Sequence, residues 1–451
     1  MGADLDRIFK AYDVRGVVPE DLDADLARRI GASFARWCGS PALALGRDCR
    51  LSSPELAAAI TEGATAQGVD VIDLGLASTD LLYFASGSLN MPGIMLTASH
   101  NPKQYNGLKF CLAGARPVGE DSGLREIRDM VEADDLPAAS QRGKVRARDL
   151  LEPFVEHVLS FADVHEMRPL TVVADTANGM GGLVVPAVME RLPVKLHHLF
   201  PELDGTFPNH PADPLEPENQ RDLRAAVLEH GADVGLAFDG DADRVFFLDE
   251  QADDVSGSLL TALVATAMLR REPGARVVHN LICSWVVPET IRDHGGEPVR
   301  TRVGHSFIKR LMAETGAIFG GEHSGHYYFR DNYRADSGLI AAVVAMSELS
   351  ASGGPLSALL APLRRYAASG EINSSVDDAA ATIEAISLAL SDGHQDRLDG
   401  LTVEYADWWC NVRASNTEPL LRLNAEARTP ALLHDRTTMM LDLIRGGTRE
   451  P

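Results

Sequence analysis

Strand-like and helix-like segments alternate along most of this chain, and that alternation constrains its fold more than any other feature. An apolar run at residues 42–45 is followed by a helix-like segment for which Ser53 is the expected N-cap and Pro54 the first helical residue. That helix is expected to end just before residues 69–74, which alternate in polarity as a strand does. Repeated units of this kind are typical of α/β architecture.

The same strand–loop–helix theme occurs twice more. Residues 170–175 form a strand-like run that leads through a glycine-rich turn into a helix from Val184, and residues 276–278 begin a third such section. The last part of the chain differs, because short strand-like runs over residues 401–426 precede a final helix. The sequence therefore predicts an α/β fold in which three mixed units of similar build are followed by a smaller α+β unit.

A chain of 451 residues is too long for one hydrophobic core, since single cores stop growing at about 250–300 residues. Stretches that are polar or rich in Gly and Pro are the expected boundaries, at residues 136–149, 251–257 and 353–370. The predicted domains are residues 1–150, 151–253, 254–366 and 367–451.

The formal net charge of −23 at pH 7 excludes some partners and sets a condition on others. Such a chain repels nucleic acid and anionic membranes at long range, so we expect neither as a partner. An anionic substrate would need a local cluster of Arg and Lys. The five cysteines contain no C-x-x-C pair, the N-terminus lacks the layout of a signal peptide, and the apolar residues 259–269 are too few to span a bilayer. We therefore expect a cytoplasmic protein with residues 259–269 in a buried helix.

A serine stands at the end of a strand-like run, where a polar turn begins. Apolar residues 93–96 lead into Thr-Ala-Ser-His-Asn-Pro at residues 97–102, and the proline restricts the residue before it, so that the turn is fixed. The hydroxyl of Ser99 is thus placed to project into a cleft, where functional residues of α/β folds commonly lie. A plain turn is the alternative for this segment alone. A protease-like triad does not fit, because His100 is adjacent to the serine and no G-x-S-x-G elbow is present.

Three aspartates at alternate positions follow another strand-like run. Asp239, Asp241 and Asp243 come directly after the apolar residues 234–238, and such close carboxylates repel one another unless a cation neutralises them. Alternate residues of a straight strand lie about 7 Å apart, whereas two ligands of one Mg²⁺ lie within about 4.2 Å of each other. The segment must therefore curl if it binds magnesium.

Two structures other than a magnesium site could carry three such aspartates, namely an EF-hand calcium loop and a solvated acidic turn. An EF-hand calcium loop is excluded, because Arg244 stands where that loop needs glycine and the flanking segments are strand-like. A solvated acidic turn remains the alternative. We favour a metal site whose shell is completed by a phosphate oxygen, with Arg244 binding the same phosphate.

Two further loops have the composition of sugar and phosphate sites. Between glycines at residues 320–326 stand Glu322, Ser324 and His326, whose side chains can bind adjacent sugar hydroxyls while the glycines admit the backbone. The second loop follows a strand-like run and offers donors for phosphate oxygens, namely Arg413, Ser415, Asn416 and Thr417. This second loop is the local positive cluster that the acidic chain requires. A capped polar turn is the alternative for each loop taken alone.

In this order the four loops resemble those of the α-D-phosphohexomutase family, specifically its bacterial phosphomannomutase/phosphoglucomutase members. The phosphoserine, metal, sugar and phosphate loops of the family are similar to residues 97–102, 239–244, 321–326 and 413–417. The match spans the whole chain in the family's order. It implies four domains around a central cleft, the first three of a shared mixed α/β topology and the fourth smaller, which would carry the phosphoserine, the metal, the sugar and the phosphate site in turn.

The resemblance also implies a role for each matched residue. Ser99 would carry phosphate, and Mg²⁺ would be held by that phosphate with Asp239, Asp241 and Asp243. Tyr12 and Arg15 would line the site, with Arg244 beside the transferred group. Lys109 and His305 are the general acid and base candidates. Glu322 and Ser324 would hold the sugar hydroxyls. The phosphate that is not transferred would be held by Arg413, Ser415, Asn416 and Thr417.

The implied reaction moves a phosphoryl group between the two ends of a hexose phosphate. Phosphoserine donates to the monophosphate, and the resulting hexose 1,6-bisphosphate, which is both intermediate and activator, turns over and returns its other phosphate to Ser99. The sugar loop is most similar to those of enzymes that act on mannose or glucose phosphates, and our hypothesis is activity on both with mannose preferred. The alternatives are a phosphoglucosamine mutase, a metal-dependent phosphatase, and a sugar-phosphate- or metal-binding protein without turnover. The sequence leaves monomer and homodimer open.

Overall fold

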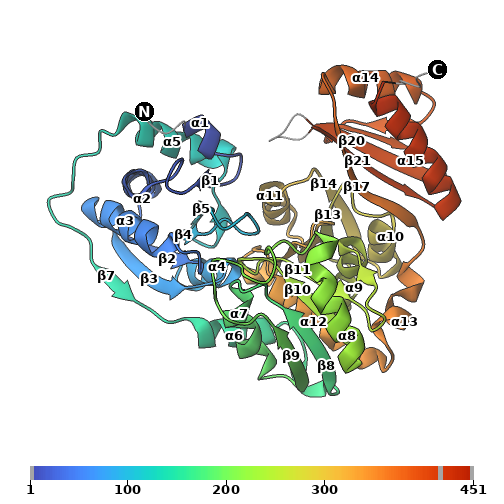
Figure 1. Ribbon diagram of the computed structural model, residues 1–451, viewed down its shortest axis with the longest axis horizontal. Helices are drawn as coiled ribbons and strands as arrows, with labels where there is room; N and C mark the ends of the chain where they lie inside the picture. The colour runs from blue at the N-terminus through green and yellow to red at the C-terminus, as the bar shows by residue number, and fades with distance from the viewer. Residues whose placement is uncertain (1–4, 415–419, 447–451) are drawn as a thin grey trace.

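The computed structural model describes residues 5–414 and 420–446, which form four sheets. Figure 1 shows the first sheet at the left in blue, the second and third in the centre, and the fourth at the upper right in orange and red. The first sheet has the order β1-β5-β4-β2-β3-β7, with β6 paired to β5. Its strands are β1 (Val14–Val17), β2 (Ala42–Arg47), β3 (Asp70–Leu76), β4 (Gly93–Leu96), β5 (Tyr105–Leu112), β6 (Arg116–Pro117) and β7 (Val145–Ala147).

Helices cover both faces of the first sheet. One face packs on α2, α3 and α5, and the other packs on α4. The helices of this part of the chain are α1 (Leu5–Ile8), α2 (Ala24–Cys38), α3 (Ser53–Ala66), α4 (Thr79–Ser88), the 3₁₀ turn η1 (Glu120–Ser122) and α5 (Leu124–Ala133).

The second sheet has the order β12-β11-β10-β8-β9. Its strands are β8 (Leu170–Asp175), β9 (Val194–Leu199), β10 (Val234–Phe238), β11 (Val245–Leu248) and β12 (Asp254–Val255). The accompanying helices are α6 (Leu151–Leu159), η2 (Val164–Glu166), α7 (Gly181–Met189), η3 (Pro217–Gln220) and α8 (Arg221–His230).

The third sheet has the order β14-β13-β15-β16. Its strands are β13 (Arg276–Asn280), β14 (Glu297–Thr301), β15 (Phe319–Gly321) and β16 (Tyr327–Phe329). The accompanying helices are α9 (Gly257–Arg271), α10 (Val286–Asp293), α11 (His305–Thr315), η4 (Arg330–Asn332), α12 (Gly338–Ser352), α13 (Leu356–Leu360) and η5 (Ala361–Leu363).

These three sheets share one topology, which confirms the prediction of similar mixed α/β units. In each, a central strand has a parallel neighbour on either side, and a fourth strand runs antiparallel beyond one of them. The four strands, in chain order, are β2–β5 in the first sheet, β8–β11 in the second and β13–β16 in the third. The connection from the third to the fourth strand is a short turn at the carboxyl end of a buried parallel strand, which is where α/β folds place ligands.

The fourth sheet is antiparallel throughout, as expected for a smaller α+β unit, and has the order β17-β21-β20-β19-β18. Its own apolar cluster includes residues of both of its helices. Its elements are β17 (Ala367–Ser375), α14 (Ala379–Ala389), β18 (His394–Asp396), β19 (Leu401–Glu404), β20 (Trp408–Ala414), β21 (Leu420–Ala427) and α15 (Pro430–Ile444).

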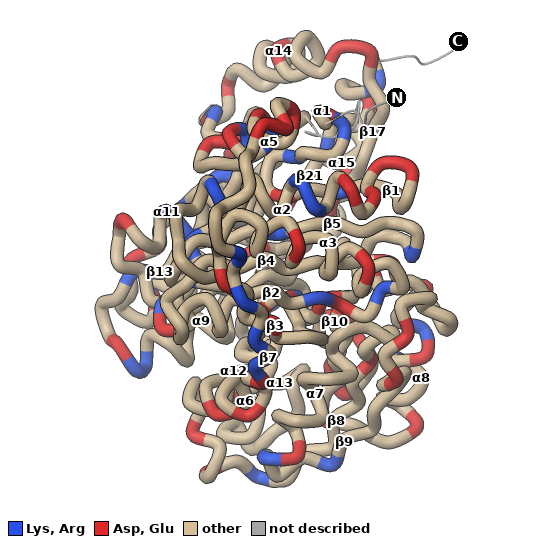
Figure 2. Tube along the Cα trace, turned by 90° about the vertical axis from the view of Figure 1, so that its left-hand side faces the viewer, with Lys and Arg blue, Asp and Glu red and all other residues tan. Residues whose placement is uncertain are grey.

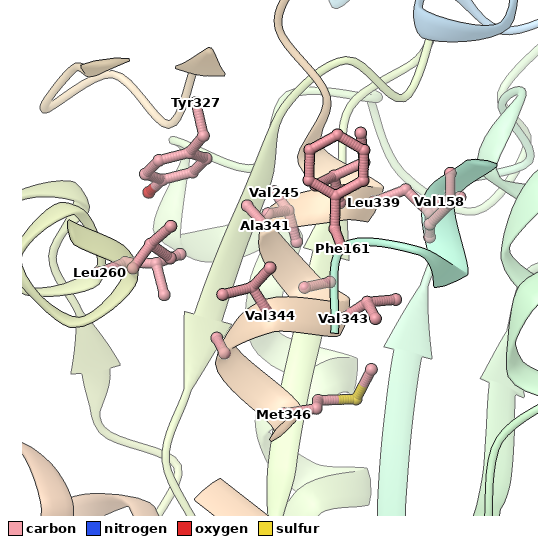
Figure 3. Close-up of a cluster of buried hydrophobic side chains, with 14 of the residues drawn as sticks. Val158, Phe161, Val245, Leu260, Tyr327, Leu339, Ala341, Val343, Val344 and Met346 are labelled. Atoms are coloured by element: carbon pink, nitrogen blue, oxygen red, sulfur yellow. The ribbon is translucent and has the colours of Figure 1, made fainter. Parts of the chain in front are cut away.

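The largest apolar cluster joins the second and third sheets around α12. Figure 3 shows Val158 of α6, Val245 of β11, Leu260 of α9 and Tyr327 of β16 around that helix. Residues 259–269 lie within α9 and are buried except for Thr266, as the sequence predicted. Among the described residues no single helix is long and apolar enough to cross a membrane. The pair formed by α12 and the following residues 356–363 meets the length and composition criteria only together and is bent by 96°.

Two local features differ from, or add to, what the sequence predicted. Ser53 is not the N-cap of α3: the cap position belongs to Ser52, whose side chain makes no capping bond, while Ser53 donates to Asp48 Oδ1 over 2.6 Å. The edge strand β7 carries the exposed Arg146 and is flanked by the exposed Lys144 and Arg148, in a basic stretch that Figure 2 shows. Charged side chains on an edge strand prevent its pairing with other chains.

Candidate active site

The three equivalent connections between third and fourth strands meet at one place. We call residues 97–104 the serine loop, residues 239–244 the aspartate loop and residues 322–326 the glutamate loop. Ser99 Oγ donates to Asp239 Oδ2 over 2.7 Å, which joins the first two loops. Ligand atoms of Asp243 and His326 lie within 4.8 Å of each other, which joins the second and third. One topology used three times therefore delivers three different loops to a common site.

The serine loop is held in an unusual backbone conformation. Ser99 has a φ of 49°, in the left-handed region that residues other than glycine rarely adopt, and its N–H donates to Thr97 Oγ1 over 2.9 Å. Its neighbour across the interface must be glycine, because a Cβ on Gly240 would lie 2.3 Å from the Ser99 carbonyl oxygen. The serine and aspartate loops are therefore in direct backbone contact.

A single buried arginine that the sequence analysis missed supports the serine loop. The Arg50 side chain is fully buried and pairs with Asp48 over 3.1 Å. Its guanidinium also donates, over 2.7–3.0 Å, to the backbone carbonyls of Ser99, Asn101, Pro102 and Tyr105. Because four backbone carbonyls accept from one guanidinium, this side chain fixes the course of the whole turn. Phe207 of the second unit covers the guanidinium, with its ring centroid 5.1 Å away.

The aspartate loop curls as the spacing of its carboxylates requires. Ala242 has a φ of 61°, and its N–H donates to the Asp239 carbonyl over 3.1 Å to close a turn. The three aspartates are no more than 1% exposed, and one oxygen of each lies within 4.8 Å of the others. Oxygen atoms gathered in this way are the ligands that hard divalent cations prefer.

Two cations partly neutralise this cluster. Lys109 Nζ donates to Asp241 Oδ2 over 2.7 Å and to Asp243 Oδ2 over 2.6 Å, while Arg244 Nε donates to Asp239 Oδ2 over 2.9 Å. The other oxygen of Asp241 and of Asp243 is buried and has no hydrogen-bond partner in the described part of the chain. A buried carboxylate oxygen without a partner is costly, so these residues fit a bound divalent cation.

The ionisation of the cluster follows from burial and from these contacts. Burial raises the pKa of Asp239 to about 7, against the opposing charge of Arg244. Burial also acts to raise the pKa of Asp241, but the Lys109 ammonium and the Thr79 hydroxyl hold that pKa well below its usual value. The same carboxylates raise the pKa of Lys109 well above its ordinary value, although burial opposes them. Lys109 is therefore a cation at neutral pH.

His100 does not form a protease-like pair with the serine. Although His100 is adjacent to the serine in the chain, its Nδ1 lies 3.3 Å from Ser99 Oγ. However, the same nitrogen accepts from Arg244 Nη2 over 2.7 Å. Burial and the charges of Arg244 and Arg15 lower the pKa of His100 to about 2. A neutral ring whose nitrogen is already occupied is not a base for the hydroxyl.

Arg15 binds the other side of the serine loop. It lies on β1, beside β5, and its Nε donates to Asp13 Oδ2 over 2.7 Å. Its Nη1 donates to Asn101 Oδ1 and, over 3.4 Å, to the Ala98 carbonyl. The structure thus brings together Arg15, Ser99, Lys109, Arg244 and the three aspartates, all of which the sequence singled out.

In the glutamate loop the Glu322 carboxylate is fixed by donors from three other segments. Tyr328 Oη donates to Oε2 over 2.7 Å, while Asn280 Nδ2 and the Gly304 N–H donate to Oε1 over 3.2 Å and 3.3 Å. Ser324 Oγ lies 3.2 Å from His326 Nδ1, so these two predicted residues form a pair. Neither Asn280 nor Tyr328 carried a signal in the sequence.

A cavity of about 700 Å³ separates the glutamate loop from the fourth sheet. His323 and Ser324 line one side, and Glu371 and Asn424 line another. The last two hold Arg413, which donates to Glu371 Oε2 over 2.5 Å and to Asn424 Oδ1 over 3.0 Å. The glutamate loop and the predicted phosphate residue therefore flank one space. Ser99 and the aspartate cluster are not among the residues that line it.

The remaining predicted residues have different positions. Tyr12 lines a separate cavity of about 530 Å³ with Ser306 and Phe307, and its hydroxyl would meet a Cβ on Gly304 at 2.7 Å. His305 is the first residue of α11, and the structure does not describe its side chain. Ser415, Asn416 and Thr417 lie outside the described residues.

The fold and the site define a class of protein: an α/β enzyme whose repeated sheets bring a serine to a buried carboxylate cluster. The chain belongs to the phosphoglucomutase/phosphomannomutase family, because models of all four domains of that family match it in order. Alpha/beta/alpha domains I, II and III and the C-terminal domain match residues 6–138, 152–253, 256–366 and 371–443.

Proteins similar over their full length agree with this assignment. A Xanthomonas campestris protein named phosphohexose mutases is 43% identical over 443 residues, 97% of this chain and 99% of that one. A phosphomannomutase of Escherichia coli K12 is 39% identical over 448 residues, 97% of this chain and 98% of that one. The crystal structure of a Burkholderia thailandensis family protein covers 99% of both chains at 33% identity, with a TM-score of 0.89. The chain is therefore a mutase of the phosphohexomutase type.

Proposed function

We propose that this enzyme interconverts hexose 1-phosphate and hexose 6-phosphate, with mannose preferred and glucose accepted, through phosphorylated Ser99 and a hexose 1,6-bisphosphate. The observation that carries the proposal is the 2.7 Å contact between Ser99 Oγ and Asp239 Oδ2. The two residues are 140 positions apart in the chain, and their contact brings a hydroxyl to a cluster of buried carboxylates. A phosphate on that hydroxyl would lie beside both the carboxylates and Arg244.

The aspartates are the proposed ligands of Mg²⁺, together with an oxygen of the Ser99 phosphate. Support comes from the all-oxygen donor set and from the buried oxygens of Asp241 and Asp243 that have no partner among the described residues. A bound Mg²⁺ would neutralise the charge that develops on the transferred phosphoryl group.

The proposed transfer breaks the phosphorus–oxygen bond to Ser99 and forms one to a hydroxyl of the bound hexose monophosphate. The hydroxyl gives up its proton, and the serine oxygen gains one. Lys109 and His305 are the proposed carriers of these protons. Arg15 and Arg244 bind the two sides of the serine loop and are proposed to orient the transferred group. After the bisphosphate turns over, its other phosphate returns to Ser99 by the reverse step.

The proposed sugar site is the glutamate loop, where Glu322, Ser324 and His326 would bind hydroxyls of the hexose. The fixed carboxylate of Glu322 supports this role, because Oε2 retains a lone pair after accepting from Tyr328, while Asn280 and Gly304 donate to Oε1. Tyr12, near Gly304, would line the same side. The phosphate that is not transferred would lie toward the fourth sheet, held by Arg413, Ser415, Asn416 and Thr417. Movement of that sheet would close the site around the substrate.

Intact-mass analysis of freshly purified enzyme tests the central step. We expect a fraction of molecules with one added phosphate, mapped by peptide analysis to Ser99, and removal of that adduct by hexose monophosphate. Ser99→Ala should carry no adduct and should lose activity by about 10⁴-fold or more, as expected when a nucleophile is removed. Full activity in Ser99→Ala, or an adduct only on other residues, would contradict the mechanism.

A substrate panel separates this function from its alternatives. With catalytic hexose 1,6-bisphosphate and Mg²⁺, we expect turnover of mannose 1-phosphate to exceed that of glucose 1-phosphate, and little turnover of glucosamine 1-phosphate. Preference for the amino sugar would make the enzyme a phosphoglucosamine mutase. Release of inorganic phosphate as the main product would make it a phosphatase, and no turnover would leave only a binding protein.

A further inference from the structure

Helix α4 of the first unit begins directly on the aspartate loop of the second. The Thr79 hydroxyl donates to Asp241 Oδ2 over 2.5 Å, and the Thr79 N–H donates to the Asp241 carbonyl over 3.0 Å. Neither residue is exposed to solvent. A helix residue of the first unit therefore holds both the backbone and the side chain of one predicted metal ligand.

The start of α4 is itself fixed, so Thr79 has little freedom to move. Ser78 is the N-cap, with its hydroxyl accepting from the Leu81 N–H, and Ser78 also donates to Asp80 Oδ1. The other oxygen of Asp80 accepts from Ser337 Oγ over 2.7 Å. Ser337 in turn is the N-cap of α12 in the third unit. Three neighbouring residues at the start of α4 thus connect three units of the protein.

The contact decides which oxygen of Asp241 remains free. Oδ2 accepts from both Thr79 and Lys109, whereas Oδ1 is buried without a partner in the described part of the chain. Without the threonine, the carboxylate would keep only its bond to Lys109 and could rotate about it. Donors that hold a metal-binding carboxylate in one orientation favour metal binding, and their loss costs about 10–100-fold in metal affinity or activity.

We propose that Thr79 is a positioning residue for the divalent cation: it holds Asp241 so that Oδ1 faces the ion. This inference rests on the proposed metal site. It also means that the ligand set of the second unit is complete only when α4 of the first unit is in place. Nothing in residues 77–81 has the pattern of a metal-binding motif, and the role follows only from the contact.

Titration of the full-length, dephosphorylated enzyme with Mn²⁺, followed by electron paramagnetic resonance, tests the proposal. We expect Thr79→Val to weaken Mn²⁺ binding by about 10–100-fold, and Thr79→Ser, which keeps the hydroxyl, to bind like the wild type. Thr65→Val is the matched control, because it removes a threonine hydroxyl that donates only to carbonyls within α3. The turnover lost in Thr79→Val should return at high Mg²⁺ concentration.

Two outcomes would overturn the inference in distinguishable ways. If the wild type binds no Mn²⁺, the proposed metal site fails and this inference fails with it. If the wild type binds Mn²⁺ and folded Thr79→Val binds equally well, only the role of Thr79 fails. Should the valine variant not fold, as judged by circular dichroism, Thr79→Ala provides the same comparison.

Discussion

The serine loop and the aspartate loop occupy the same place in two sheets of the same topology, yet they are supported in opposite ways. The serine loop is held from within its own unit, by one buried guanidinium that binds four backbone carbonyls. The aspartate loop takes donors for its carboxylates from the other unit, through Thr79 and Lys109. Buried carboxylates need cations to neutralise them. Arg244 of the loop itself pairs with Asp239, and the neighbouring unit supplies the cation for Asp241 and Asp243. The proposed metal site would thus be a property of the interface between units.

We expect the largest effect from a variant that removes the support of the serine loop. Arg50→Gln leaves four backbone carbonyls and the buried Asp48 without the guanidinium, so we expect the free energy of unfolding to fall by about 3–5 kcal/mol. We also expect kcat to fall about 100-fold through displacement of Ser99. Arg50→Lys should recover only part of both, because an ammonium cannot replace the planar fork.

Thermal unfolding and steady-state kinetics check this expectation. Arg36→Gln is the control, since Arg36 lies exposed on α2 and the loss of a surface arginine should change neither quantity. An Arg50→Gln enzyme with wild-type kcat would show that the serine loop keeps its shape without the guanidinium.

Removal of Lys109 tests whether the aspartate loop depends on a cation from the first unit. Lys109→Met leaves the buried carboxylates of Asp241 and Asp243 without their ammonium, which should cost about 3–5 kcal/mol of stability in metal-free enzyme. Added Mg²⁺ should then raise the melting temperature of Lys109→Met more than that of the wild type. Lys103→Met, in the exposed part of the serine loop, is the matched control. Equal stabilisation of both enzymes by Mg²⁺ would contradict the interface model.

The contact between the two loops is tested by a smaller change. Gly240→Ala places a Cβ 2.3 Å from the Ser99 carbonyl, so the loops must separate, at a cost of about 1–3 kcal/mol. The fraction of phosphorylated Ser99 should fall as well, because the hydroxyl moves away from the carboxylates. Gly354→Ala, where the added Cβ meets nothing within 4 Å, should leave both unchanged. A fully phosphorylated, equally stable Gly240→Ala enzyme would refute the close approach.

The glutamate loop should make the stability of the protein depend on pH, through His323. Burial and the charge of Arg413 lower the pKa of His323 from 6.5 to about 3. Between these values the unfolded chain binds a proton that the folded protein does not, so stability is complete above pH 6.5 and decreases as the pH falls. The slope is at most about 1.4 kcal/mol per pH unit. Denaturant unfolding from pH 7 to pH 4 should show a shallower decline in His323→Gln than in the wild type, and no such change in His434→Gln, on the surface of α15.

Much of the fold could be predicted from the sequence because its signals are local. Buried parallel strands appear as apolar runs, and the repeated theme followed from their regular alternation with helices. The curl of the aspartate loop was predictable for a different reason, since the reach of one metal ion is shorter than the rise between alternate residues of a strand. The candidate site was predicted at Ser99 and at Asp239 because each belongs to a polar cluster that follows a buried strand.

What could not be predicted depends on partners that are distant in the chain. Serine is a residue type favoured at N-caps, but the Ser53 hydroxyl instead donates to Asp48. Arg50 was missed because a lone arginine usually lies at the surface, and its acceptors are carbonyls about 50 residues away. Nothing in the sequence near Thr79 indicated its role, since its partner Asp241 lies in the aspartate loop of the second unit. Local patterns identify the groups that do the chemistry more readily than the groups that hold them in place.

Each of the three loops is carried by a different sheet, so that one loop can be changed without altering the strands that hold the other two. The five residues 322–326 lie between β15 and β16, and the serine and aspartate loops contribute no strand to that sheet. If these five residues form the sugar site, as proposed, their exchange for the corresponding segment of another mutase is a route to new sugar specificity. The exchange would leave the proposed phosphoryl-transfer groups unchanged, because they are carried by the other two sheets.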